Sequence, residues 1–256
     1  MDSLAVVFSV LYQLATNASF LLLAGLGLIV ILGMMNIINL AHGELMMLGA
    51  YTTTILYHRG IPFPIAVVAA FFAVALVGAL LERLVVRRFY GERLGALVVT
   101  WGISLVLSQG TLMLLGPFMP SIPIPGGSVS VGQYSFSDYW LILIAVTALL
   151  LVALGVLYNR TSFGLHARAT MQKPEIARAL GVNTDRIYLL TFSLGAGLAG
   201  LSGALLAPTV SIAPFMGQQF VAPAFITVVV GGATNVIAGA LGASTLLSFV
   251  KAPFGL

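Results

Sequence analysis

Apolar stretches of about 20 residues or more recur along this chain, and they constrain its fold more than any other feature. A helix of about this length is needed to cross about 30 Å of hydrocarbon at 1.5 Å per residue. The first stretch, residues 4–35, is interrupted by Asn17 and Ser19. Further stretches cover residues 38–57, 61–86, 94–115, 139–158, 188–207 and 220–250. We therefore predict an all-α fold, a polytopic transmembrane helix bundle.

The last stretch, residues 220–250, decides the number of predicted spans. Gly231, Gly232 and Asn235 interrupt it, so it forms either one helix or two short ones. The prediction is seven or eight spans, with broken or re-entrant helices. The chain starts with Asp2 and no Lys or Arg, so the positive region of a cleavable signal peptide is missing.

Charged residues are too few for a protein that folds in water. The 11 basic and 7 acidic residues amount to 7% of the chain, against about 25% in a typical soluble domain. This composition excludes a soluble enzyme domain and a disordered chain. The chain also has no Cys, which excludes disulfides, zinc sites built from Cys, and thiol catalysis.

The positive charges are concentrated in two segments, which the predicted spans place on one side of the membrane. Cytoplasmic loops are enriched in Lys and Arg, so this side is the cytoplasm and the N-terminus lies outside. The connection on the other side, residues 116–138, has no basic residue and is rich in Pro and Gly. The net charge of +4 therefore reflects topology and not nucleic-acid binding. The two segments hold nine of the eleven basic residues: Arg83, Arg87, Arg88 and Arg93, then Arg160, Arg168, Lys173, Arg178 and Arg186.

Two amides, an imidazole and a carboxylate lie close together after the first apolar stretch, at Asn36, Asn39, His42 and Glu44. Ionisable groups inside a bilayer usually face a cavity or a partner, so one interpretation is the lining of a translocation path. Another is a helix–loop–helix connection in which Asn36 or Asn39 caps a helix and Glu44 lies in its first turn. A third combines the two, with the cap inside a re-entrant break. The residues favour none of these over the others.

The longest polar stretch, residues 159–187, contains a short helix. Pro174 suits its first turn, Glu175 favours its positive N-terminal end, and Gly181 is a natural stop. An apolar stripe at helical spacing is formed by Ile176, Ala179 and Leu180. Such a helix either docks into a groove of another protein or lies as a solvated loop helix on the chain's own spans. The residues by themselves favour the second arrangement.

Glycine and alanine recur at intervals of four between residues 195 and 204. Small residues at this spacing let helix backbones approach closely in lipid, so we interpret them as a packing surface. A P-loop is excluded because the only lysines, Lys173 and Lys251, stand in no such motif. No catalytic residues are predicted. Metal binding by His42 and Glu44 is disfavoured because no third ligand stands nearby.

These motifs together resemble a known family, the inner-membrane permeases of branched-chain amino acid ABC importers, which has a urea and short-chain amide branch. The string Asn-Ile-Ile-Asn-Leu-Ala-His-Gly-Glu at residues 36–44 is similar to the family's signature. Residues 174–183 resemble its coupling loop. Further similarity lies in residues 49–51, Arg186, Phe192, residues 195–208 and residues 224–232. Residues 116–138 carry little resemblance.

The resemblance implies a transport subunit and not an enzyme. It implies a multi-pass protein of the bacterial inner membrane, with one permease domain over residues 1–256 and a cytoplasmic coupling loop at about residues 159–187. The expected partners are a second, related permease, two ATPase subunits and a periplasmic solute-binding protein. ATP and Mg are expected on the ATPase subunits, with no cofactor on this chain.

The resemblance also implies roles for individual residues. The substrate path is expected to include Asn36, Asn39, His42, Glu44 and Gln109. Contacts that couple the permease to the ATPase subunits are expected from Arg168, Glu175, Ala177, Arg178 and Gly181. The family's coupling motif reads Glu-Ala-Ala…Gly, and Ile176 stands where the motif has its first Ala. Despite this departure, the resemblance favours docking of the short helix on an ATPase subunit.

Two other features depart from the family, and the solute stays open. Residues 231–235 read Gly-Gly-Ala-Thr-Asn where the family often has Gly-Gly-x-Gly-Ser, so details of the broken helix there do not carry over. Family members usually continue for another span beyond the position of Leu256, which makes a truncated sequence one expectation. Gln109 and residues 100–105 look more like the urea and amide branch than like the amino acid importers.

Two other function classes compete with an ATP-driven permease. One is a self-sufficient channel or secondary transporter for a small neutral solute. The other is a membrane-embedded enzyme that uses His42 and Glu44. A positively charged docking helix on the cytoplasmic side favours the ATP-driven permease, because a channel has no need of one.

Overall fold

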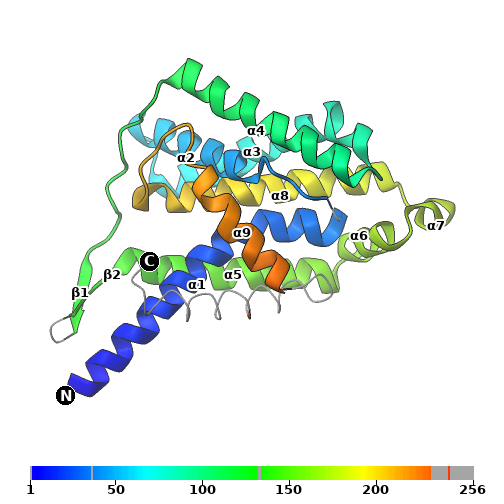
Figure 1. Ribbon diagram of the computed structural model, residues 1–256. Coiled ribbons are helices and arrows are strands. Elements are labelled where there is room, and N and C mark those ends of the chain that lie inside the picture. The colour runs from blue at the N-terminus through cyan, green and yellow to red at the C-terminus, as the bar shows by residue number, and fades with distance from the viewer. Residues whose placement is uncertain (1, 36, 132–133, 232–241, 243–256) are drawn as a thin grey trace.

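The computed structural model describes residues 2–35, 37–131, 134–231 and 242. Within these residues the chain forms a helix bundle with one β-hairpin (Figure 1). The helices are α1 (Asp2–Met35), α2 (His42–His58), α3 (Phe63–Leu84), α4 (Arg93–Leu115), α5 (Asp138–Arg160), α6 (Ser162–Gln172), α7 (Pro174–Ala179), α8 (Thr184–Leu206) and α9 (Gln218–Gly231). Two 3-10 turns are η1 (Val86–Phe89) and η2 (Ala207–Thr209), and the strands are β1 (Ser128–Val131) and β2 (Tyr134–Ser137).

Five of the described helices are long and apolar enough to cross a membrane, namely α1, α3, α4, α5 and α8. Helices α2 and α9 are shorter, with 17 and 14 residues. These helices follow the order of the predicted apolar stretches, so the predicted all-α transmembrane bundle is confirmed. The described residues thus hold five full-length span candidates, and the count of seven or eight spans stays a prediction. The interruption predicted after Gly231 and the rest of the last stretch lie outside the described residues.

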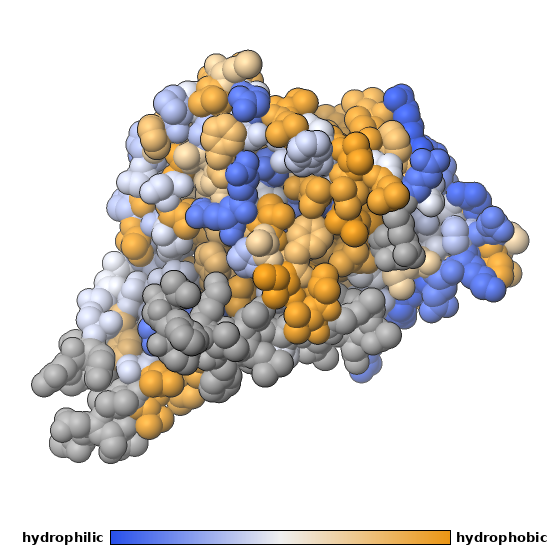
Figure 2. All heavy atoms as spheres, in the orientation of Figure 1, coloured by the Kyte–Doolittle hydropathy of each residue, from blue (hydrophilic) through white to orange (hydrophobic). Residues whose placement is uncertain are grey.

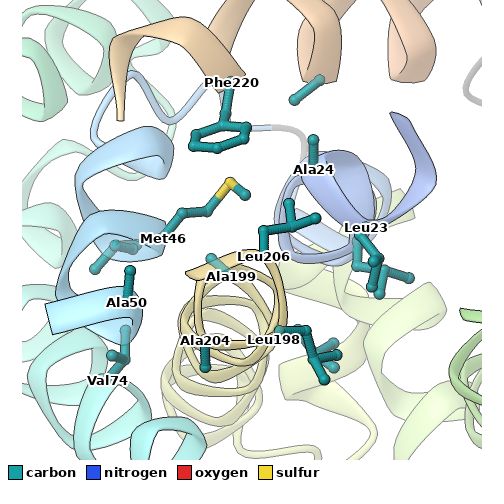
Figure 3. Packing of buried hydrophobic residues seen from close by; sticks show 14 of the residues in the cluster. Leu23, Ala24, Met46, Ala50, Val74, Leu198, Ala199, Ala204, Leu206 and Phe220 are labelled. Atoms are coloured by element: carbon teal, nitrogen blue, oxygen red, sulfur yellow. The ribbon is translucent and has the colours of Figure 1, made fainter. Parts of the chain in front are cut away.

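Helix α8 packs against α1, α2 and α3 and forms the centre of the bundle. A Cβ atom at Gly27 of α1 would stand 2.2 Å from the Gly195 carbonyl oxygen. One at Gly203 would stand 1.9 Å from the Met46 carbonyl oxygen of α2. Figure 3 shows Ala199 and Ala204 of α8 among the buried side chains of its neighbours. The small residues of α8 therefore let backbones approach closely, as predicted.

The predicted outward connection, residues 116–138, contains an antiparallel hairpin that pairs Ser128 with Ser137. The alternating Ser-Val-Ser-Val of β1 has the period of a strand, although no strand was predicted there. The hairpin is fastened to α1, because Phe136 is buried against the ring of Phe8 and the Tyr12 hydroxyl donates a 3.0 Å hydrogen bond to the Ser137 carbonyl.

The two basic segments lie at the same end of the bundle. Arg87 in η1, from the first segment, forms an ion pair with Asp185 at the start of α8, within the second segment. Hydrophilic side chains gather at the end that carries α6 and α7, whereas apolar ones cover the middle of this face (Figure 2). This arrangement agrees with a membrane-spanning middle and a basic cytoplasmic end.

Candidate translocation path and coupling surface

The connection between α1 and α2 turns back into the bundle. Helix α1 ends at Met35, and yet the His42 Nε2 atom at the start of α2 lies 2.7 Å from the Ala24 carbonyl oxygen. Ala24 precedes Met35 by 11 residues, which is about 16 Å along a helix. Figure 1 shows the connection running back from the end of α1. Helix α2 therefore begins deep inside the bundle, which is the predicted re-entrant break.

The start of α2 is held by side chains of its own segment and of α4. The Asn39 Oδ1 atom accepts a 3.0 Å hydrogen bond from the Ala41 backbone N–H, and Thr100 Oγ1 accepts one of 3.1 Å from Leu40. Ala41 occupies the capping position and no side chain caps the helix. The interpretation of Asn39 as the cap of α2 is therefore wrong, whereas Glu44 does lie in the first turn.

A second short helix begins at the same place. A Cβ atom at Gly43 would stand 2.2 Å from the Gly217 carbonyl oxygen, and one at Gly217 would stand 2.4 Å from the Gly43 carbonyl oxygen. Gly43 is in the first turn of α2, and Gly217 immediately precedes α9. The N-terminal ends of two short helices thus cross inside the bundle. Such interrupted helices are tolerated in membranes where protein or a cavity satisfies the freed backbone groups.

Three buried polar side chains around this crossing keep unused hydrogen-bonding atoms. Asn39, His42 and Glu44 are each at most 1% exposed. Their Nδ2, Nδ1 and Oε2 atoms have no hydrogen-bond partner among the described residues. A buried polar atom without a partner is destabilising, by about 1–3 kcal/mol in protein mutational data. The arrangement is therefore hard to explain as packing alone.

Helix α4 turns a stripe of hydroxyl groups inward, at Thr100, Ser104, Ser108 and Thr111. Ser104 of this stripe contacts the Glu44 carboxyl group. The spacing of three and four residues in an apolar helix could have revealed the stripe from the sequence. Gln109, which was assigned to the substrate path, is instead exposed on the outer surface of α4.

The polar segment at residues 159–187 forms two helices, α6 and α7, in place of one. Lys173 separates them, because Pro174 has no backbone N–H and therefore starts a new helix. Gly181 ends α7 with a φ of +87°, and its N–H donates to the Arg178 carbonyl, while the Val182 N–H donates to that of Ala177. These two bonds form a Schellman motif, so Gly181 stops the helix as predicted.

Helix α7 exposes most of its surface. Glu175 is exposed, and the apolar Ile176 and Leu180 are 52% and 79% exposed, whereas Ala177 is buried. A cavity of about 300 Å³ lies along this surface, lined by Ala169, Gln172, Lys173, Ile176, Ala177 and Leu180. The stripe of α7 therefore does not rest on the described membrane helices. This exposure fits docking on another protein and equally a solvated loop helix, so the choice between them stays a prediction.

Comparison with known protein families shows which family this chain belongs to. The family described as the permease component of branched-chain amino acid transport systems matches residues 10–255. The chain belongs to this family. It is therefore a multi-pass permease of the inner membrane, as the sequence resemblance implied.

Individual permeases are similar in sequence to this chain. LivH of Escherichia coli, a high-affinity branched-chain amino acid transport permease, is 30% identical over 93% of this chain and 82% of its own length. BraD of Pseudomonas aeruginosa, a protein of the same description, is 29% identical over 94% and 83%. LsrC of Yersinia enterocolitica, an autoinducer 2 import permease, is 32% identical over 61% and 44%. No solved structure matches the permease.

The residues that were expected to couple the permease to its ATPases differ in their exposure. Glu175, Arg178 and Gly181 are exposed, but Arg168 is half-buried. The Arg168 guanidinium donates to the Tyr158 carbonyl and lies 4.9 Å from the centre of the Tyr158 ring. It therefore fastens α6 to the end of α5. Asn36, the remaining residue of the expected path, lies outside the described residues.

Proposed function

We propose that this permease imports a small solute, which it receives from a periplasmic binding protein, and that two ATPase subunits drive it together with a second permease. The crossing of α2 and α9 forms part of the translocation path. Helix α7 is the surface that binds an ATPase subunit. The observation that carries the proposal is the set of buried, unpartnered atoms of Asn39, His42 and Glu44. Such atoms suit a solute that passes and leaves.

The solute that we propose is a branched-chain amino acid. LivH and BraD, which are similar to this chain over most of its length, are described as permeases for such amino acids. Glu44 and Asn39 offer a carboxylate and an amide to the polar end of the solute. The likeness to the urea branch rested partly on Gln109, which lies on the outer surface and adds no second amide to the crossing.

Reconstitution tests the proposed function against a self-sufficient channel. Vesicles that contain this chain, the second permease, both ATPase subunits and the binding protein are expected to accumulate labelled leucine only when ATP is supplied. Vesicles with this chain alone are expected to show less than about a tenth of that uptake. Without the ATPase subunits, nothing shifts the permease between the state open to the outside and the state open to the inside. Equal flux without ATP and partners would establish the channel instead.

Cysteine labelling tests the path, since the chain has no native Cys. Asn39 is fully buried. A cysteine in its place (Asn39→Cys) is expected to resist a water-soluble maleimide at rest and to react during ATP turnover. Thr54→Cys, equally buried in α2, is expected to stay unreactive throughout, and Arg59→Cys, on the exposed outer end, to react always. Protection of Asn39→Cys in every transport state would exclude Asn39 from the path.

A further inference from the structure

The cytoplasmic ends of α3 and α8 enclose a pocket that the proposed transport does not use. Its volume is about 260 Å³. It is lined by Glu82, Arg83, Arg87, Asn183, Asp185, Arg186 and Leu189, and we call it the basic pocket. Three arginines face two acidic residues there. The charge left for a ligand therefore depends on the partners of these two acidic side chains.

Both acidic residues of the basic pocket already have partners. Asp185 forms an ion pair with Arg87 and lies 3.8 Å from Arg178 of α7. Glu82 is buried and accepts a hydrogen bond from the Tyr90 hydroxyl. Burial, and then the contact with Glu82, raise the pKa of Tyr90 above its usual value.

The lining of the basic pocket keeps a net positive charge, because its three arginines outnumber its two acidic residues. Arg83 and Arg186 are exposed, and neither forms an ion pair within the part of the chain that the structure describes. A guanidinium group is planar and offers paired N–H donors that match the geometry of a phosphate. The basic pocket therefore suits an anion with phosphate oxygens.

The position of the pocket points to the source of that phosphate. Arg83 lies in the last turn of α3, where this membrane helix ends. Phe72, Leu76 and Leu80 follow one another at intervals of four residues and are all more than half exposed, so they form an apolar stripe that leads to Arg83. On α8, the exposed Leu190 follows Arg186 by four residues. Apolar surface thus borders the pocket on its membrane side.

We propose that the basic pocket binds the head group of an anionic phospholipid of the cytoplasmic leaflet. Arg83 and Arg186 hold the phosphate, and an acyl chain lies along the stripe of Phe72, Leu76 and Leu80. Basic pockets between membrane helices on the cytoplasmic side suit such head groups, and each arginine adds to the attraction. A soluble phosphate compound would use the arginines but would gain nothing from the stripe.

Native mass spectrometry of the full chain tests this proposal. The delipidated permease is titrated with phosphatidylglycerol or phosphatidylcholine of the same acyl chains, and the retained lipid is counted. We expect the first phosphatidylglycerol to bind at least tenfold more tightly than phosphatidylcholine. The double variant Arg83→Gln and Arg186→Gln is expected to bind the two lipids about equally, since about fivefold for each charge amounts to about 25-fold for the pair.

Arg88→Gln is the matched control, because Arg88 is exposed in η1 and does not line the pocket. It is expected to retain phosphatidylglycerol as the wild type does. Equal retention of the two lipids by the wild type, or an unchanged preference in the double variant, would overturn the proposal. Displacement of the bound lipid by inorganic phosphate at millimolar concentration would also overturn it, since the site would then take phosphate without the acyl chain. Melting curves of all variants check that each is folded.

Discussion

Replacing Gly49 by alanine is expected to destabilise the permease by about 3 kcal/mol, the upper end of the usual range for overpacked cores. The added Cβ atom would stand 1.9 Å from the Gly200 carbonyl oxygen, and the backbone carbon atoms of Gly200 lie 2.5 Å from it. Backbone atoms cannot rotate away as a side chain does, so α2 must move off α8. Thermal melting of the purified protein in detergent, followed by size-exclusion chromatography, measures the loss.

Gly102→Ala is the matched control for this prediction. Gly102 also lies inside a membrane helix, α4, but nothing stands within 4 Å of the position that its added Cβ atom would take. Its replacement should leave the melting temperature unchanged or raise it slightly, because alanine favours a helix more than glycine does. If both variants melt alike, the close approach of α2 and α8 is not what stabilises the bundle.

Changes in α7 are expected to abolish transport without unfolding the permease. Gly181→Pro removes the N–H that donates to the Arg178 carbonyl, and proline cannot adopt the φ of +87° found there. The end of α7 must therefore change direction. Glu175→Ala removes an exposed charge from the surface that we propose the ATPase grips. We expect uptake to fall at least about tenfold in each variant, since productive closure of an ATP-driven transporter depends on oriented contacts.

Two controls separate loss of coupling from loss of structure. Gly60 ends α2 on the outer side with a φ of +86°, and its N–H donates to the Tyr57 carbonyl, so Gly60→Pro introduces the same strain away from the cytoplasm. Glu92→Ala removes an exposed cytoplasmic charge outside α6 and α7. Both are expected to keep the wild-type ratio of leucine moved to ATP hydrolysed. Normal uptake by Gly181→Pro and Glu175→Ala in membranes would show that α7 does not couple the permease to the ATPase subunits.

Much of the fold could be predicted because it depends on local composition. Within the residues that the structure describes, each long apolar stretch contains a helix, since in lipid the backbone must satisfy its own hydrogen bonds. The start of α7 at Pro174 and its end at Gly181 were predicted for the same reason, because they depend on φ and on a missing N–H. The Ser-Val alternation of β1 is an equally local signal, and it indicates the strand that the sequence prediction lacked.

The candidate site was predicted only in part. The polar residues Asn39, His42 and Glu44 were singled out by their chemistry, but nothing in the sequence says how deep they lie. Gln109 and Arg168 were predicted from motifs, and a motif does not fix the side of the helix or the neighbour that each residue faces. Arg168 lies against Tyr158, ten residues earlier, and Gln109 faces away from the buried stripe of α4.

The sequence by itself determined that this protein is a membrane helix bundle, that its basic residues gather in two segments, and where α7 starts and stops. These properties follow from hydropathy, charge and backbone geometry over short stretches of chain. Only the tertiary structure decided that α2 begins beside Ala24 and crosses the start of α9 at Gly217. That crossing joins segments more than 170 residues apart, and close backbone contact there depends on the packing of the whole bundle around α8.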